Sequence, residues 1–109
     1  MQTQAAEKII AQMVQRIVAE VDPQKIILFG SYARGTAGPD SDVDLMVVMP
    51  VQGSRRQKRV AIRTALSGMG LAKDVIVVTP EEVERYRDTA GTLIRPALRE
   101  GKVLYEQPN

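Results

Sequence analysis

At its centre the chain reads FGSYARGTAGPDSDVDLMVV, residues 29–48. A short apolar run over 25–29 leads into Gly30-Ser31, and a second apolar run over 43–49 starts within Asp42-Val43-Asp44 and stops at Pro50. Continuous apolar runs of this length that stop at glycine or proline are typical of buried strands. We therefore expect two buried strands, one ending in a glycine-serine turn and the other beginning with a pair of acids.

The acid pair suggests a metal site. Side chains of Asp42 and Asp44 should point to one face of the strand, roughly 7 Å apart along the chain, and two such carboxylates repel unless a cation lies between them. A D-x-D alone is more often a solvated strand entrance or an Asx turn. Here the run over 45–48 is too apolar for a surface turn, and Asp74 precedes a similar run over 75–78. With no histidine or cysteine in the chain, three acids predict an all-oxygen site for Mg²⁺ or Mn²⁺.

Gly30-Ser31 is suited to binding phosphate. Glycine at a strand end lets the backbone approach a ligand closely, and the first helical turn after it presents free N–H groups and a positive dipole end. Ser31 adds a hydroxyl donor. A tight turn at Gly30 with a helix cap at Ser31 explains the same residues without a ligand, and both roles are compatible with phosphate binding.

These groups also predict the sheet topology. For the glycine-serine turn to meet the acid pair, the first two strands must run antiparallel. For Asp74 to join them, the strand over 75–78 must run parallel to the strand over 43–49, and the helix over 54–69 becomes a right-handed crossover. We therefore predict an α/β (α+β) fold with a small mixed sheet flanked by helices.

The remaining elements follow from periodicity and capping signals. Apolar periodicity predicts a helix over 3–21, and Val60, Leu66 and Met69 are expected to face inward from the crossover helix. Thr79-Pro80-Glu81-Glu82 is a capping box. The other predicted elements are a helical turn over 31–34, a helix over 80–88, a helix capped by Thr92 with Pro96 as its fourth residue and its end at Gly101, and a strand over 102–105.

Composition limits the function classes. The chain has 109 residues, 44% of them hydrophobic, which predicts one domain over 1–109. A net charge of +2 and 4% aromatic residues do not favour a nucleic-acid groove, although nucleic acid stays possible as a partner. The start, Met1 to Gln4, lacks a leader, and no apolar run approaches a membrane span, so we expect a cytoplasmic protein with no membrane partner.

Two basic features leave alternatives open. The crossover helix carries five basic residues: Arg55, Arg56, Lys58, Arg59 and Arg63. A solvated face explains them, and a docking surface for an acidic partner or for RNA explains them too. Arg34 lies one helical turn after Ser31, where it either contacts phosphate or pairs with a nearby acid such as Asp40 or Asp42.

The segments 30–35 (GSYARG) and 41–45 (SDVDL), together with the closing run 99–106 (REGKVLYE), resemble the minimal nucleotidyltransferase (MNT) branch of the DNA polymerase beta nucleotidyltransferase superfamily. The resemblance covers nearly the whole chain. It implies that Asp42 and Asp44 hold two divalent ions, that Asp74 binds the catalytic ion, and that Gly30 and Ser31 contact the triphosphate. It further implies in-line attack by an acceptor hydroxyl on the α-phosphorus, with Asp74 as the candidate proton acceptor.

The resemblance also implies a substrate and a partner. Stand-alone MNT proteins commonly pair with a HEPN-domain ribonuclease toxin and act as antitoxins by adenylylating a toxin tyrosine, with ATP as the donor. The short chain agrees with an acceptor held largely by another polypeptide. Two alternatives stay open: an antitoxin that acts by binding alone, and a transferase for a small molecule or an RNA end.

Overall fold

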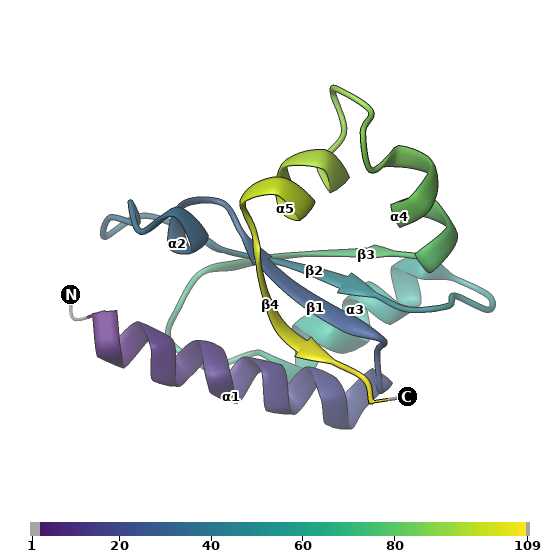
Figure 1. The fold of residues 1–109 in the computed structure, drawn as a ribbon. Coiled ribbons are helices and arrows are strands. Elements are labelled where there is room, and N and C mark those ends of the chain that lie inside the picture. The colour runs from purple at the N-terminus through teal and green to yellow at the C-terminus, as the bar shows by residue number, and fades with distance from the viewer. Residues whose placement is uncertain (1–2, 109) are drawn as a thin grey trace.

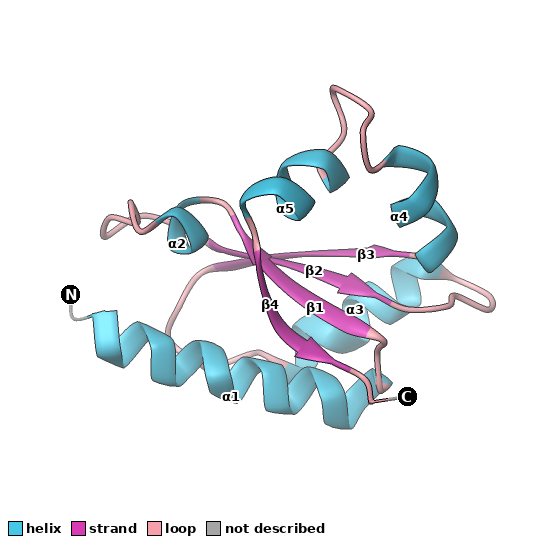
Figure 2. Ribbon diagram, in the orientation of Figure 1, coloured by secondary structure: helices cyan, strands magenta, loops and turns pink. Residues whose placement is uncertain are grey.

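The computed structural model describes residues 3–108, so Met1 and Gln2 of the expected leaderless start lie outside the described residues. Helices and strands alternate along the chain (Figures 1 and 2). The helices are α1 (Thr3–Val21), α2 (Ser31–Arg34), α3 (Arg55–Ala65), α4 (Pro80–Tyr86) and α5 (Ile94–Glu100). The strands are β1 (Lys25–Phe29), β2 (Val43–Val48), β3 (Lys73–Val78) and β4 (Lys102–Glu106).

The strands form a four-stranded mixed sheet in the order β3-β2-β1-β4. β1 pairs antiparallel with both β2 and β4, and β2 pairs parallel with β3. α3 makes the crossover between the parallel pair, because parallel neighbours need a long connection. The predicted fold class and the predicted strand directions are confirmed.

Helices cover both faces of the sheet, as Figure 1 shows with α1 below it and α4 and α5 above it. On one face α1 and α3 pack on alternate strand residues, and Met13, Ile17 and Ile62 are fully buried there. On the other face, α5 contributes the buried Ile94 and Ala97. Because side chains alternate along each strand, neighbouring strand residues point to opposite faces of the sheet and belong to two different hydrophobic cores.

The crossover helix differs from its prediction. α3 ends at Ala65, four residues before Met69, and Val60 is 51% exposed, so its expected inward orientation is wrong. Ile62 and Leu66, one turn apart, are the fully buried residues. Each helical residue turns by about 100°, which puts Val60 nearly opposite the Ile62–Leu66 direction. Met69 is half-buried against the same core, as expected.

The predicted cap of α4 is confirmed, and the predicted cap of α5 is wrong by one residue. The side chain of Thr79 accepts from the backbone N–H of Glu82 at 3.1 Å, and Oε1 of Glu82 accepts from the N–H of Thr79 at 2.9 Å, which confirms the capping box of α4. In α5 the cap residue is Leu93, so Pro96 is the third helical residue and not the fourth. Oγ1 of Thr92 still accepts from the backbone N–H of Arg95 at 3.4 Å.

Within residues 3–108, no helix combines the length and the apolar character needed to cross a membrane.

Candidate metal and nucleotide site

Gly30 closes β1 in a conformation that only glycine adopts readily. Its φ of 75° and ψ of −156° lie in a region nearly closed to residues with a side chain. A Cβ at this position would also collide with Oδ2 of Asp44 and lie 3.1 Å from its Cγ. The glycine-serine turn and the acid at the start of β2 are therefore in direct contact, which the sequence could only suggest.

Strand register places two of the three predicted acids side by side. Asp44 is the register partner of Phe29 in β1 and of Asp74 in β3. Neighbouring strands are about 4.8 Å apart, and register partners share a face. Phe29 belongs to the core beneath α5, so both carboxylates lie on the α4–α5 face of the sheet. Asp42, one residue before β2, is exposed, and Asp44 is half-buried.

The carboxylates are not drawn together into a metal cage. Across residues 3–108, no three acidic side chains are arranged to hold an ion. Oδ1 of Asp74 instead lies 4.0 Å from Nη1 of Arg63. Strand pairing thus brings Asp44 and Asp74 side by side. The Asp74 carboxylate lies near the guanidinium group of Arg63 on α3.

Burial and two neighbouring acids disfavour the ionised form of Asp44. The pKa of Asp44 is raised from its ordinary value of 3.8, first by burial and then by the negative charges of Asp74 and Asp42; Arg34 opposes the rise. Burial and the two neighbouring charges all disfavour the ionised carboxylate. A divalent cation would reverse that penalty, and an all-oxygen donor set suits Mg²⁺ or Mn²⁺. The oxygen donors of the three acids therefore suit such an ion, but among residues 3–108 their side chains are not gathered around one point.

Arg34 pairs with neither of the acids expected. Its Nη1 lies 3.5 Å from Oε1 of Glu100, and both side chains are about half exposed. The expectation of a pair with Asp40 or Asp42 is wrong because α5 ends beside α2, which no local spacing could reveal. The positive charge of Arg34 nonetheless offsets part of the rise in the pKa of Asp44, so Arg34 interacts electrostatically with this acid.

Arg63 is the residue near the site that the sequence did not single out. It was one of five basic residues on a predicted crossover helix, without a separate role. A signal was available: a crossover helix between parallel strands returns to the edge from which the second strand starts, so its last turn lies near Asp74.

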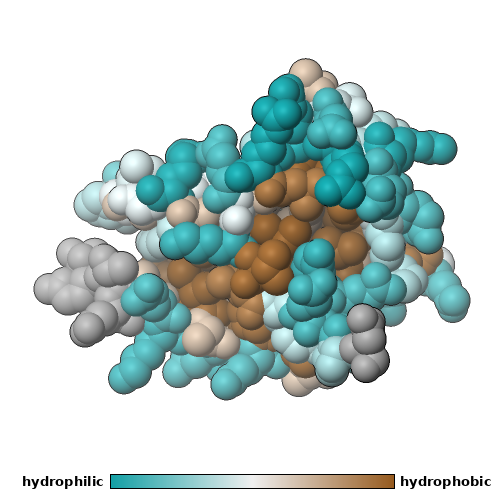
Figure 3. Space-filling view, in the orientation of Figure 1, coloured by the Kyte–Doolittle hydropathy of each residue, from teal (hydrophilic) through white to brown (hydrophobic). Residues whose placement is uncertain are grey.

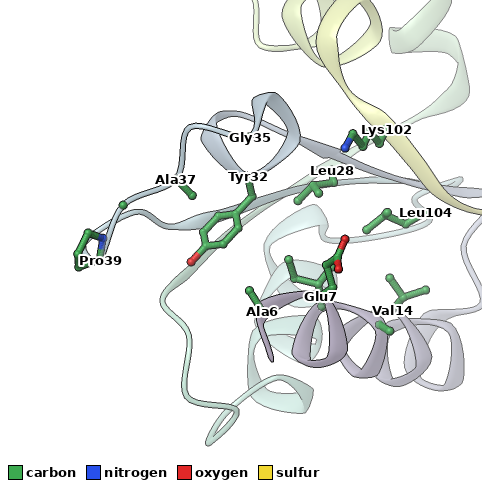
Figure 4. Close-up of a pocket in the computed structure, with 13 residues that line it drawn as sticks. Ala6, Glu7, Val14, Leu28, Tyr32, Gly35, Ala37, Pro39, Lys102 and Leu104 are labelled. Atoms are coloured by element: carbon green, nitrogen blue, oxygen red, sulfur yellow. The ribbon is translucent and has the colours of Figure 1, made fainter. Parts of the chain in front are cut away.

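An apolar cavity lies elsewhere in the described part of the chain. It measures about 590 Å³ between α1, β4 and the loop after α2, and mostly apolar residues line it. Figure 4 shows Tyr32 directed from α2 into this space, opposite Ala6 and Glu7 of α1. An apolar area is also visible in the middle of this side of the molecule (Figure 3). None of the three candidate metal ligands lines the cavity, so it is separate from the acid site.

The chain is similar to proteins of a known family. A family model described as a nucleotidyltransferase domain matches residues 7–105. Two proteins of Methanocaldococcus jannaschii, whose names propose protein adenylyltransferase activity, are each 36% identical, over 77% and 49% of this chain. The chain spans 59% and 52% of the lengths of these two relatives.

Solved structures share the fold. A proposed nucleotidyltransferase from Sulfolobus solfataricus aligns over 98% of this chain and 90% of its own, with a TM-score of 0.65 and 18% identity. A mutant of the MntA-HpeT toxin–antitoxin aligns over 88% of this chain and 72% of its own, with a TM-score of 0.66 and 19% identity. A toxin–antitoxin with AMP-PNP aligns over 89% and 73%, with a TM-score of 0.55 and 24% identity.

Proposed function

This chain belongs to the nucleotidyltransferase domain family, and we propose that it transfers AMP from ATP to a hydroxyl of a partner protein. The observation that carries the proposal is the contact between Gly30 and Asp44. It joins a turn suited to phosphate with an acid that stands beside Asp74. The names of the two archaeal relatives support protein as the acceptor.

Each candidate residue has a role in this proposal. Gly30 and Ser31 would bind the triphosphate through backbone N–H groups and the Ser31 hydroxyl, and Arg34 would add positive charge beside them. Asp42, Asp44 and Asp74 would hold two divalent ions. Bound Mg²⁺ or Mn²⁺ would supply Lewis-acid stabilisation of the negative charge on the phosphate oxygens.

The transfer balances without any other reactant. The acceptor oxygen forms a bond to the α-phosphorus, the bond from that phosphorus to the bridging oxygen breaks, and pyrophosphate leaves. The proton of the acceptor hydroxyl passes to a carboxylate, for which the exposed Asp74 on the edge strand β3 is the candidate.

The finer proposal is that the acceptor is a tyrosine of a HEPN-domain toxin and that the chain is its antitoxin. Its support is the resemblance to MNT proteins and the fold shared with chains of two toxin–antitoxin structures. The fold by itself does not carry function, so this identification depends on experiment.

One experiment separates the possible acceptors. The chain is incubated with α-labelled ATP, Mg²⁺ and the product of the neighbouring gene, and label retained on protein is measured after denaturation. We expect label on the partner, lost with Asp42→Ala or Asp44→Ala and kept with the exposed control Asp88→Ala. Toxin inhibition that persists in both site variants would indicate an antitoxin acting by binding alone. Label only on RNA or a small molecule would contradict transfer to protein.

A further inference from the structure

Basic residues are unevenly distributed along this chain. Between Leu45 and Lys73 there are six basic residues and no acidic residue. The remaining residues hold nine basic and 13 acidic side chains, so their net charge is −4 while the whole chain carries +2. The positive charge of the protein is therefore concentrated on α3 and its flanking loops.

One arginine of α3 has a structural task. Nη1 of Arg55 donates to the carbonyl of Val77 at 3.4 Å, and its Nη2 lies 3.0 Å from Oε2 of Glu82. β3 is an edge strand, and an arginine that binds its carbonyl helps to close that edge. Arg55 is thus accounted for by the fold.

Three other arginines are left on an exposed face. Arg56, Arg59 and Arg63 are three and four residues apart and are all exposed. At about 100° per residue they lie within about 60° of one another around the helix, away from the buried Ile62. Among the residues described, neither Arg56 nor Arg59 has a carboxylate within 4.0 Å, and Arg63 meets only Asp74. We name Arg56, Arg59 and Arg63 the arginine face.

The arginine face leads to the candidate site. α3 returns from the far end of β2 to the edge where β3 begins, and Arg63, in its last turn, lies 4.0 Å from Asp74. An anionic segment lying along the helix would therefore pass from Arg56 to Arg63, which lies beside Asp74. This continuity distinguishes the arginine face from a solvated patch placed at random.

We propose that the arginine face binds an acidic segment of the acceptor protein and so guides the acceptor hydroxyl to the site beside Asp74. The inference deepens the proposed function and rests on it. Arginine pairs with carboxylates through two parallel hydrogen bonds, and like-charged surroundings on α3 would reject basic partners. The charge thus gives both attraction and selectivity.

A protein segment fits this surface better than RNA. All four aromatic residues of the chain, Phe29, Tyr32, Tyr86 and Tyr105, lie outside residues 33–85. Single-stranded RNA is held largely by bases stacked on aromatic side chains, which α3 does not offer. Binding of peptide carboxylates requires only the guanidinium groups of the arginine face.

The test measures binding without catalysis. A fluorescent peptide of alternating glutamate and glycine, and a single-stranded oligoadenylate, are titrated with the full chain by fluorescence anisotropy at low and moderate salt. We expect the peptide to bind, Arg59→Glu to weaken binding about tenfold, and Arg59→Lys to weaken it less, because lysine keeps the charge and loses the paired hydrogen bonds. Lys8→Glu, an equal charge change on the exposed face of α1, should alter it less than about twofold.

Several results would overturn the proposal: no peptide binding, equal loss with Lys8→Glu and Arg59→Glu, or tighter binding of oligoadenylate than of the peptide. The labelling assay then separates the two proposals. With a labelled partner, Arg59→Glu should raise KM for the partner and leave kcat and KM for ATP unchanged. If the native chain labels no protein, the proposed function fails, whereas the peptide titration still decides whether the arginine face binds acids.

Discussion

Gly30 lies so close to the carboxylate of Asp44 that a methyl group on Gly30 would collide with Oδ2. This contact couples the end of β1 to the start of β2 at the point where their antiparallel register ends. Any side chain at position 30 must displace the acid, the turn, or both.

Gly30→Ala should therefore reduce both stability and activity. A side chain at φ 75° and ψ −156° costs about 1–3 kcal/mol of strain, before the collision with Asp44 is added. Urea unfolding and the ATP-labelling rate measure the two effects. Gly38→Ala is the matched control because nothing lies within 4 Å of its added Cβ, and it should be nearly neutral. A Gly30→Ala protein with native stability and rate would show that Gly30 and Asp44 are not in contact.

Asp44→Asn should abolish transfer and stabilise the metal-free protein. Burial and the charges of Asp74 and Asp42 raise the pKa of Asp44, so the folded state is penalised once this carboxyl ionises. Below its ordinary pKa of 3.8 the carboxyl is protonated in both states and the penalty is absent. As pH rises through the raised pKa, the native chain loses stability relative to the variant.

Thermal unfolding without metal across this pH range tests the prediction. The Tm values of the two proteins should converge at acid pH, and the variant should unfold at the higher temperature near neutrality. Added Mg²⁺ should raise the Tm of the native chain and leave that of the variant nearly unchanged. Asp88→Asn, an exposed position, should follow the native curve. Equal Tm values near neutral pH would exclude the proposed repulsion.

Arg34→Ala should weaken nucleotide binding without unfolding the protein. Its ion pair with Glu100 is half exposed, and such pairs contribute about 0–1 kcal/mol. Loss of a charged phosphate contact should raise KM for ATP about tenfold. Glu100→Gln breaks the same ion pair while keeping the guanidinium, so its KM should stay native. A shared increase in both variants would mean that the pair orders α2 and α5 and that Arg34 does not contact nucleotide.

Glu82→Gln should reduce the loss of folding stability that the native chain shows as the pH falls below about 4.5. The backbone N–H of Thr79 lowers the pKa of Glu82 most strongly; burial opposes this, and Arg55 adds to the lowering. The stabilisation is thus complete above the ordinary pKa of 4.5 and is lost as pH falls through the lowered value. The Tm of the native chain should fall over that pH interval, and the Tm of the variant should fall less.

Thr79→Ala removes the other half of the capping box and should cost about 1 kcal/mol. Glu84→Gln serves as the comparison, because Glu84 joins only an exposed pair with Arg87 among the residues described. If Glu84→Gln reduced the loss of stability at acid pH as strongly as Glu82→Gln, the capping box would not be the source.

The predictions from sequence were accurate where the cause was local. The strand over 25–29 and the capping box of α4 match their predictions, whereas β3 begins at Lys73, two residues before the predicted 75–78, and β2 ends at Val48, one residue before the predicted end. The errors occurred where geometry depends on distant packing. Val60 is apolar, but α3 is rotated about its axis so that Ile62 and Leu66 face the core and Val60 faces solvent. The roles of the candidate site residues stay predictions until the variants are measured.

Residue types and their spacing by themselves determined most element positions, the acid pair and the glycine-serine turn, because these depend on the chemistry of neighbours in the chain. The tertiary structure alone decided that Asp44 stands beside Asp74, that Gly30 contacts Asp44, that Arg34 meets Glu100 and that Arg63 reaches Asp74. Each of these pairs joins segments whose separation is set by strand register and helix packing. Only the closed fold brings such partners within reach of one another.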